Sequence, residues 1–129
     1  MELFEATRQG DIERVTLLLD QGVDVNTKDE EGRTSLHIAS WRGHFDIASL
    51  LLKNGADINA RDNFGDTSLH DCCWKESVES VNFLLKNGAN TEIENNKKGK
   101  PKDNTSNDVI LKLFEDYENI PDIKEPEFD

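Results

Sequence analysis

The chain has 129 residues, of which 35% are hydrophobic and 33% are charged, and its formal net charge is -12. This length predicts one domain, and so polar a composition favours an elongated fold with much surface over a compact globule. The negative charge repels polyanions, which argues against nucleic acid or an anionic membrane as the main partner, whereas a basic protein would suit it.

Three further features bear on the compartment. No run of about 18 apolar residues occurs, so no segment is expected to span a membrane. The first residues, MELFEATRQGD, lack the charged and apolar regions of a signal peptide. Cys72 and Cys73 are adjacent, and neighbours on a helix cannot easily bond to each other. We therefore expect a reducing compartment, the cytoplasm or the nucleus.

A period of 33 residues organises most of the chain. The same residue types recur at this step at Leu3, Leu36 and Leu69, at Gly22, Gly55 and Gly88, at Thr34 and Thr67, and at Trp41 and Trp74. A shared period without gaps over three units predicts a repeat architecture. In the first unit, residues 1–28, we expect a helix pair without a leading turn, and its polar residues suit an N-terminal cap.

Two full units follow, residues 29–61 and 62–94. Each begins with a turn signal, DEEG or DNFG, and a threonine, Thr34 or Thr67, that can cap the next helix. Short first helices are predicted from Ser35 to about Arg42 and from Ser68 to about Lys75, and second helices from about Phe45 to Lys53 and from Val78 to Lys86. An Asn-Gly pair after each second helix predicts a left-handed stop.

The last unit, residues 95–117, is degraded and is predicted to form a C-terminal cap. Lys100-Pro101-Lys102-Asp103 stands where the preceding unit has Thr-Ser-Leu-His. The stretch 109–114 (VILKLF) has the pattern of a second helix, but about four residues are missing before it. The acidic tail, residues 118–129, contains Pro121 and Pro126 and is predicted to be disordered.

These units resemble the ankyrin repeat. The phrase TSLHIA at Thr34 to Ala39 matches the T-P-L-H-x-A pattern of that family, with Ser35 and Ser68 in place of its proline, and NGADIN at Asn54 to Asn59 is also typical. The resemblance covers about residues 1–94. It implies an all-α solenoid of helix-turn-helix units joined by β-turn or hairpin loops.

The resemblance also implies where a partner would bind. In this family the turn tips and first helices line a concave face that binds proteins, and the chain is expected to be a binding module and not an enzyme. The matching positions are Glu30, Glu31, Arg33, Trp41, Arg42 and Arg61 in the first full unit, and Asn63, Phe64, Asp66, Trp74 and Lys75 in the next.

The only two tryptophans occupy equivalent positions on this face. Because tryptophan is over-represented in interface hot spots, we interpret Trp41 and Trp74 as partner contacts. The alternative is that each ring fills a groove between units and belongs to the scaffold. Two rings near acidic residues such as Asp66 could also hold a cation, although an aromatic cage normally uses more than two rings.

No residue pattern predicts catalysis, a metal, a cofactor or a small-molecule substrate. The resemblance implies that His37 and His70 tie neighbouring turns together by hydrogen bonds. Cys72 and Cys73 lack the two-residue gap that lets two thiolates reach one zinc ion, and they stand at small-residue packing positions. No phosphate-binding loop or nucleophile elbow occurs.

Three functions remain open. The first is a monomeric module that binds a protein through the concave face as an adaptor, an inhibitor or an assembly subunit. The second is an acidic escort for a basic protein such as a ribosomal protein or a histone, suggested by the charge of -12. The third is a regulatory subunit of an enzyme, which resembles small kinase inhibitors built from ankyrin repeats.

Overall fold

The computed structural model describes residues 2–119, and within them it contains helices and no strand. The prediction of an all-α solenoid is confirmed. The α-helices are α1 (Glu2–Gln9), α2 (Ile12–Asp20), α3 (Ser35–Arg42), α4 (Phe45–Lys53), α5 (Ser68–Lys75), α6 (Val78–Lys86) and α7 (Asp108–Glu118), and one 3-10 helix is η1 (Pro101–Asn104). No helix in this part of the chain is both long and apolar enough to cross a bilayer.

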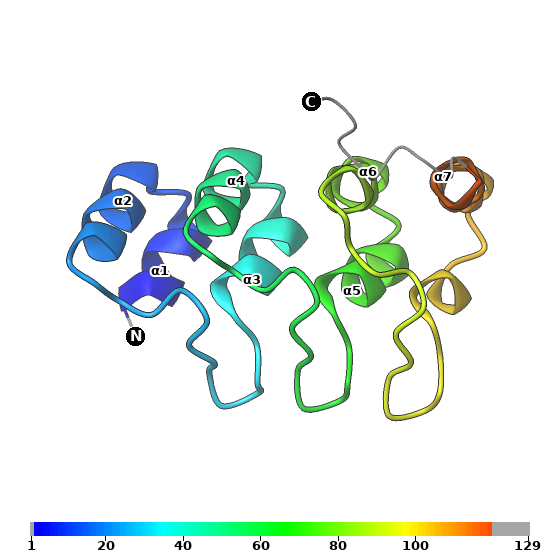
Figure 1. The fold of residues 1–129 in the computed structure, drawn as a ribbon, viewed down its shortest axis with the longest axis horizontal. Coiled ribbons are helices and arrows are strands. Elements are labelled where there is room, and N and C mark those ends of the chain that lie inside the picture. The colour runs from blue at the N-terminus through cyan, green and yellow to red at the C-terminus, as the bar shows by residue number, and fades with distance from the viewer. Residues whose placement is uncertain (1, 120–129) are drawn as a thin grey trace, which may run out of the picture.

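The helices form two rows along the long axis of the molecule. Figure 1 shows α1, α3, α5 and η1 in an inner row and α2, α4, α6 and α7 in an outer row, with three loops projecting on the side away from the outer row. The helices α1, α3 and α5 each pack against the outer helix of the same unit, and the inner helices pack in series, α1 on α3, α3 on α5 and α5 on η1. This layout is that of a linear array in which a unit contacts only its neighbours.

Local signals set the helix bounds as the sequence predicts. Thr34 and Thr67 are the N-caps of α3 and α5, and each takes part in a capping box with the histidine three residues on. After α3 the backbone turns through a left-handed residue, Gly43, with a φ of 75°. After α5 the same conformation falls on Glu76, with a φ of 63°. At both turns the chain reverses direction and enters the outer helix of the same unit, α4 or α6.

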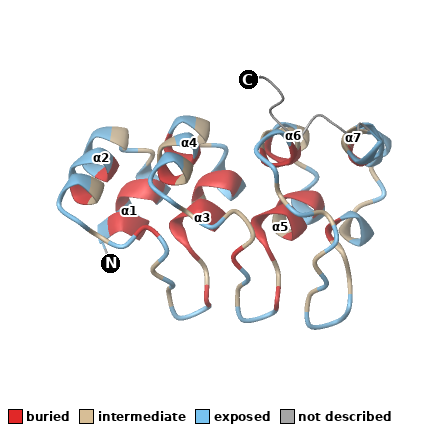
Figure 2. Cartoon of the chain, in the orientation of Figure 1, coloured by how far each residue is buried: buried red, intermediate tan, exposed pale blue. Residues whose placement is uncertain are grey.

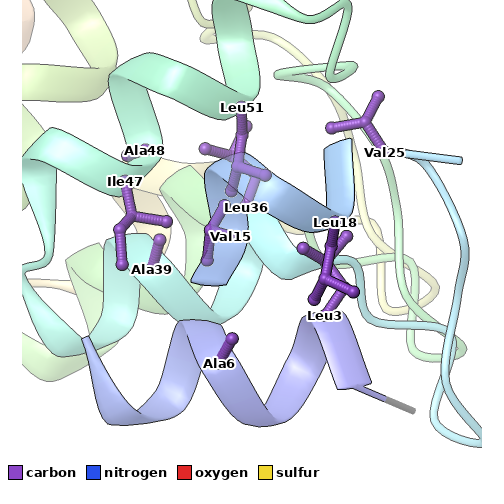
Figure 3. Packing of buried hydrophobic residues seen from close by; sticks show 10 residues of the cluster. All are labelled: Leu3, Ala6, Val15, Leu18, Val25, Leu36, Ala39, Ile47, Ala48 and Leu51. Carbon is purple, nitrogen blue, oxygen red and sulfur yellow. The ribbon is translucent and has the colours of Figure 1, made fainter. Parts of the chain in front are cut away.

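The inner helices and the inward faces of the outer helices hold the core. Figure 2 shows that α1, α3 and α5 are the most thoroughly buried elements, whereas the outer row and the loop tips are largely exposed. One cluster joins the first two units, with Leu3, Val15, Leu36 and Leu51 among its members (Figure 3). A second cluster joins α5, α6 and α7 and includes both cysteines. Complete burial of one such leucine is worth about 1.5–3 kcal/mol.

The C-terminal unit is shortened in its first helix. Only the single 3-10 turn η1 stands where the preceding units have α3 and α5, and Asn107 then caps α7 by accepting hydrogen bonds from two backbone N–H groups. Ile110 and Phe114 on α7 are buried at the same four-residue spacing as Val81 and Leu85 on α6. The predicted second helix is therefore present, and it continues to Glu118. The rest of the acidic tail, residues 120–129, lies outside the described residues.

Candidate functional site

The projecting loops are held in register by a ladder of hydrogen bonds between turn tips. The backbone N–H of Asn63 donates to the carbonyl of Glu31 at 2.9 Å, and that of Asn96 donates to the carbonyl of Phe64 at 3.0 Å. A Cβ atom on Gly65 would lie 2.7 Å from the backbone nitrogen of Asn96, and the φ of this glycine is 81°. The turn glycine is thus required both by its conformation and by the close approach of the next loop.

Two buried histidines, His37 and His70, each hydrogen-bond the loop of the next unit. In each, Nδ1 accepts the N–H of the capping threonine at 3.1 Å, so Nε2 carries the proton that it donates to the next loop. The acceptors are the carbonyls of Asp66, 3.2 Å from His37, and of Gly99, 2.8 Å from His70. Burial lowers the pKa of His37. The structural role implied by the family resemblance is confirmed for both histidines.

Trp41 and Trp74, on α3 and α5, stack on each other. Their ring centroids are 6.2 Å apart, and the ring planes are inclined by 18°. Lys75 places its ammonium nitrogen 4.8 Å from the Trp41 ring centroid and hydrogen-bonds the Trp41 carbonyl. Trp74 remains 69% exposed, whereas Trp41 is 36% exposed. The two rings therefore stabilise each other by stacking, and most of the Trp74 side chain remains exposed to solvent.

A cleft of about 540 Å³ opens beside this stack. Five residues predicted to face a partner line it: Arg33, Trp41, Phe64, Asp66 and Trp74. The other lining residues are Asp71, Asn95, Asn96, Lys97 and Asn104. The structure thus brings the aromatic side chains of the predicted surface together with carboxylates and amides in one concave site.

The remaining predicted positions lie around this cleft. Glu30, Glu31 and Arg42 are exposed, and Glu31 pairs with Arg33 at 3.5 Å. Arg61 and Asn63 are also exposed, but their side chains serve the scaffold. The Arg61 guanidinium donates to the carbonyls of Gly65 and Glu94, and the Asn63 amide donates to the carbonyl of Glu30. Partner contact stays a prediction for all of these residues.

Asp71 is the charged lining residue that sequence reasoning missed. It lies three residues before Trp74 on α5, so both side chains project from one side of the helix. Burial, followed by the negative charges of Asp62 and Asp66, raises the pKa of Asp71 to about 7, and Arg33 opposes this shift. The sequence offered one signal for this residue, because an aspartate stands at the position that Ile38 occupies in the previous unit.

The carboxylates of Asp62 and Asp71 also lie near His37, with one ligand-type atom from each residue within 4.8 Å of the others. His37 is unsuited to hold a metal there, because Nδ1 already accepts a hydrogen bond and Nε2 already donates one. The two cysteines are also unsuited to a metal site, because both pack in the hydrophobic cluster of α5, α6 and α7. Both are buried, and burial raises the pKa of each thiol to about 12, which keeps them in the unreactive thiol form.

Comparisons with known proteins agree with this architecture. A family model for ankyrin repeats, in three copies, matches residues 3–95. A stretch of 39 residues is 49% identical to integrin-linked protein kinase 1 of Arabidopsis thaliana, over 30% of this chain and 8% of that protein. A stretch of 44 residues is 46% identical to acyl-CoA-binding domain-containing protein 6 of Bos taurus, over 33% of this chain and 16% of that protein. The match thus spans less than a fifth of either relative.

Proposed function

Because the chain belongs to the ankyrin-repeat family, whose repeats generally mediate protein–protein interactions, we propose that it binds a partner protein through the cleft at Trp41 and Trp74. It acts there without catalysis, as an adaptor, an inhibitor or an assembly subunit. The observation that carries this proposal is the exposure of large aromatic side chains on one concave face. Trp74 is 69% exposed and Phe64 is 67% exposed, and both line the same cleft.

Exposed aromatic groups of this size support a binding role for a physical reason. A soluble chain loses stability in water by leaving large apolar surfaces unburied, and contiguous exposed apolar patches commonly mark interaction sites. Tryptophan in a desolvated pocket is also among the side chains that contribute most to interface free energy. The hydrogen-bonded loop ladder favours binding further, because a preformed surface loses little conformational entropy when the partner docks.

The test uses affinity capture from cells followed by quantitative binding to the purified partner. We expect Trp41→Ala with Trp74→Ala to weaken binding by about 30-fold or more, as for an interface hot spot. The matched control is Leu17→Ala with Val109→Ala, which removes two exposed apolar side chains outside the cleft. If the tryptophan variant stays folded by circular dichroism and binds as tightly as the wild type, the proposed site is wrong.

The escort function for a basic protein is the second candidate, and the net charge of -12 favours it. It predicts that binding weakens steeply as salt is raised, because long-range attraction between exposed charges is screened. It also predicts weaker binding after removal of residues 120–129, a change that leaves α7 in place. Affinity that is unchanged between low and high salt would exclude this function.

The chain is further proposed to be monomeric when unbound, since its strong net charge opposes self-association. The buried, unpaired thiols support the cytoplasm or the nucleus as its compartment. The proposed units of the array are residues 1–28, 29–61, 62–94 and 95–117. The bounds of the helix pairs support this division.

A further inference from the structure

The open side of Trp74 results from the shortened last unit. Residues 33 positions apart occupy equivalent places, and Trp41 and Trp74 are followed at this step by Asn107. In the last unit η1 ends at Asn104, and Asn107 caps the next helix and does not extend a first helix. The stack therefore stops after two rings. Trp74 has a ring neighbour in Trp41, and its greater exposure follows from this end position.

A carboxylate lies beside this open ring. Asp71 lines the cleft with Trp74, and within the described residues no hydrogen-bond donor reaches its carboxylate. Asp66 lines the same cleft, and one of its carboxylate oxygens accepts a hydrogen bond from Asn95 at 2.8 Å. The two cations of the cleft are Arg33, which pairs with Glu31, and Lys97 on the exposed loop. Arg33 does not neutralise Asp71, whose pKa remains raised to about 7.

The stacked rings already attract one cation of the chain itself. Lys75 holds its ammonium group near the Trp41 ring and within hydrogen-bonding reach of the Trp41 carbonyl. This cation is placed at Trp41, so Trp74 presents an open aromatic face beside the Asp71 carboxyl group, which forms no ion pair within the described residues. The polar amides of Asn95, Asn96 and Asn104 complete the lining.

We propose that this cleft receives an arginine side chain of the partner protein, with the guanidinium plane against Trp74 and its N–H groups donating to the Asp71 carboxylate. This inference rests on the proposed function and adds the chemistry of the partner. Arginine fits better than lysine because its planar guanidinium both stacks on an indole and presents paired donors to a carboxylate. A lysine ammonium offers a more strongly hydrated point charge.

The experiment titrates the full chain with three small probes and follows the two tryptophan indole N–H signals by NMR. The probes are N-acetyl-arginine methylamide, its uncharged isostere N-acetyl-citrulline methylamide, and N-acetyl-lysine methylamide. We expect saturable shifts at Trp74 with the arginine probe. Affinity should fall about tenfold for citrulline, which lacks the charge-assisted hydrogen bonds, and to a smaller extent for lysine.

Two variants separate the site from a general effect of charge. Asp71→Asn keeps the size of the side chain and should reduce arginine binding to the level of citrulline. Glu79→Gln removes one negative charge from an exposed position on the outer helix α6 and should leave the affinity for the arginine probe unchanged. Equal affinity for arginine and citrulline, or full binding by Asp71→Asn, overturns the proposal.

The outcome is independent of whether the protein-binding function holds. If the arginine probe fails but the double tryptophan variant still loses the partner protein, the concave face is the binding site and the arginine assignment is wrong. If the arginine probe binds and the double variant retains the partner, the pocket recognises guanidinium but the partner docks elsewhere, which contradicts both the partner assignment and the proposed site.

Discussion

The imidazole of His70 donates a hydrogen bond to the carbonyl oxygen of Gly99 across 29 residues of sequence, at 2.8 Å. The other ring nitrogen accepts the N–H of Thr67, so a single buried side chain joins a helix cap to the loop of the next unit. The equivalent bond of His37 is longer, at 3.2 Å, and ends on Asp66. The histidine is thus the joint between consecutive loops.

Removal of this joint should destabilise the C-terminal part of the array. His70→Ala leaves the Thr67 N–H and the Gly99 carbonyl without their partner and opens a cavity, which together lower the free energy of unfolding by about 2–4 kcal/mol. Urea unfolding followed by circular dichroism measures this loss. His44→Ala is the control, because His44 is only partly buried and makes one 3.3 Å contact, to the Arg8 carbonyl. A similar loss in both variants would contradict the assigned role.

Glu76 should be a position where substitution stabilises the fold. Its φ of 63° is the left-handed conformation that Gly43 adopts at the equivalent place with a φ of 75°. Glu76→Gly should raise the free energy of unfolding by about 0.5–1 kcal/mol, since glycine takes this conformation without steric strain.

The reverse change, Gly43→Ala, should lower the free energy of unfolding by about 1 kcal/mol. Thermal unfolding of both variants tests the pair. A lower melting temperature for Glu76→Gly would show that the 3.4 Å hydrogen bond from Thr105 to the Glu76 carboxylate outweighs the backbone strain.

Asp71 should make stability depend on pH. Its pKa is about 7 in the folded chain against an ordinary value of 3.8, so between these values the folded state binds more protons and loses stability as pH rises. Asp71→Asn removes this loss. Its stability advantage over the wild type should therefore grow by about 1–2 kcal/mol between roughly pH 5 and pH 8, after allowance for partial exposure.

Chemical denaturation of Asp71→Asn and wild type at the two pH values measures this difference. Glu79→Gln, on the exposed face of α6, should show no such growth. An advantage of Asp71→Asn that is the same at both pH values would mean that the carboxylate is already ionised in the folded chain at the lower pH.

The helices of the two full units could be predicted because their signals are local. A threonine cap, a repeated apolar face and an Asn-Gly stop fix each helix within a few residues, whatever lies around it. The loss of the first helix in the last unit was visible only as a degraded pattern. In the folded chain η1 starts at Pro101 and Asn107 already caps α7, and the Asn104 side chain donates a hydrogen bond to the His70 carbonyl of the neighbouring unit, a contact that the sequence pattern does not show.

The site was less accessible to sequence reasoning for a different reason. The repeat places Trp41, Trp74 and Phe64 on one face, but it does not tell which side chains the scaffold uses. Arg61 occupies a predicted contact position and instead donates to the backbone of its own turn and of the next loop. Asp71 was missed because its environment is made by loops that lie close only after folding.

The cleft beside Trp74 is assembled from three consecutive units, since Trp41, Trp74 and Asn96 come from one unit each. In an array whose units touch only their neighbours, the terminal unit opens most readily, and amide hydrogens there exchange first. A ligand that contacts all three units would stabilise the closed state of the terminal unit against this local opening. Binding should therefore slow amide exchange in α7, a helix that contributes no residue to the cleft.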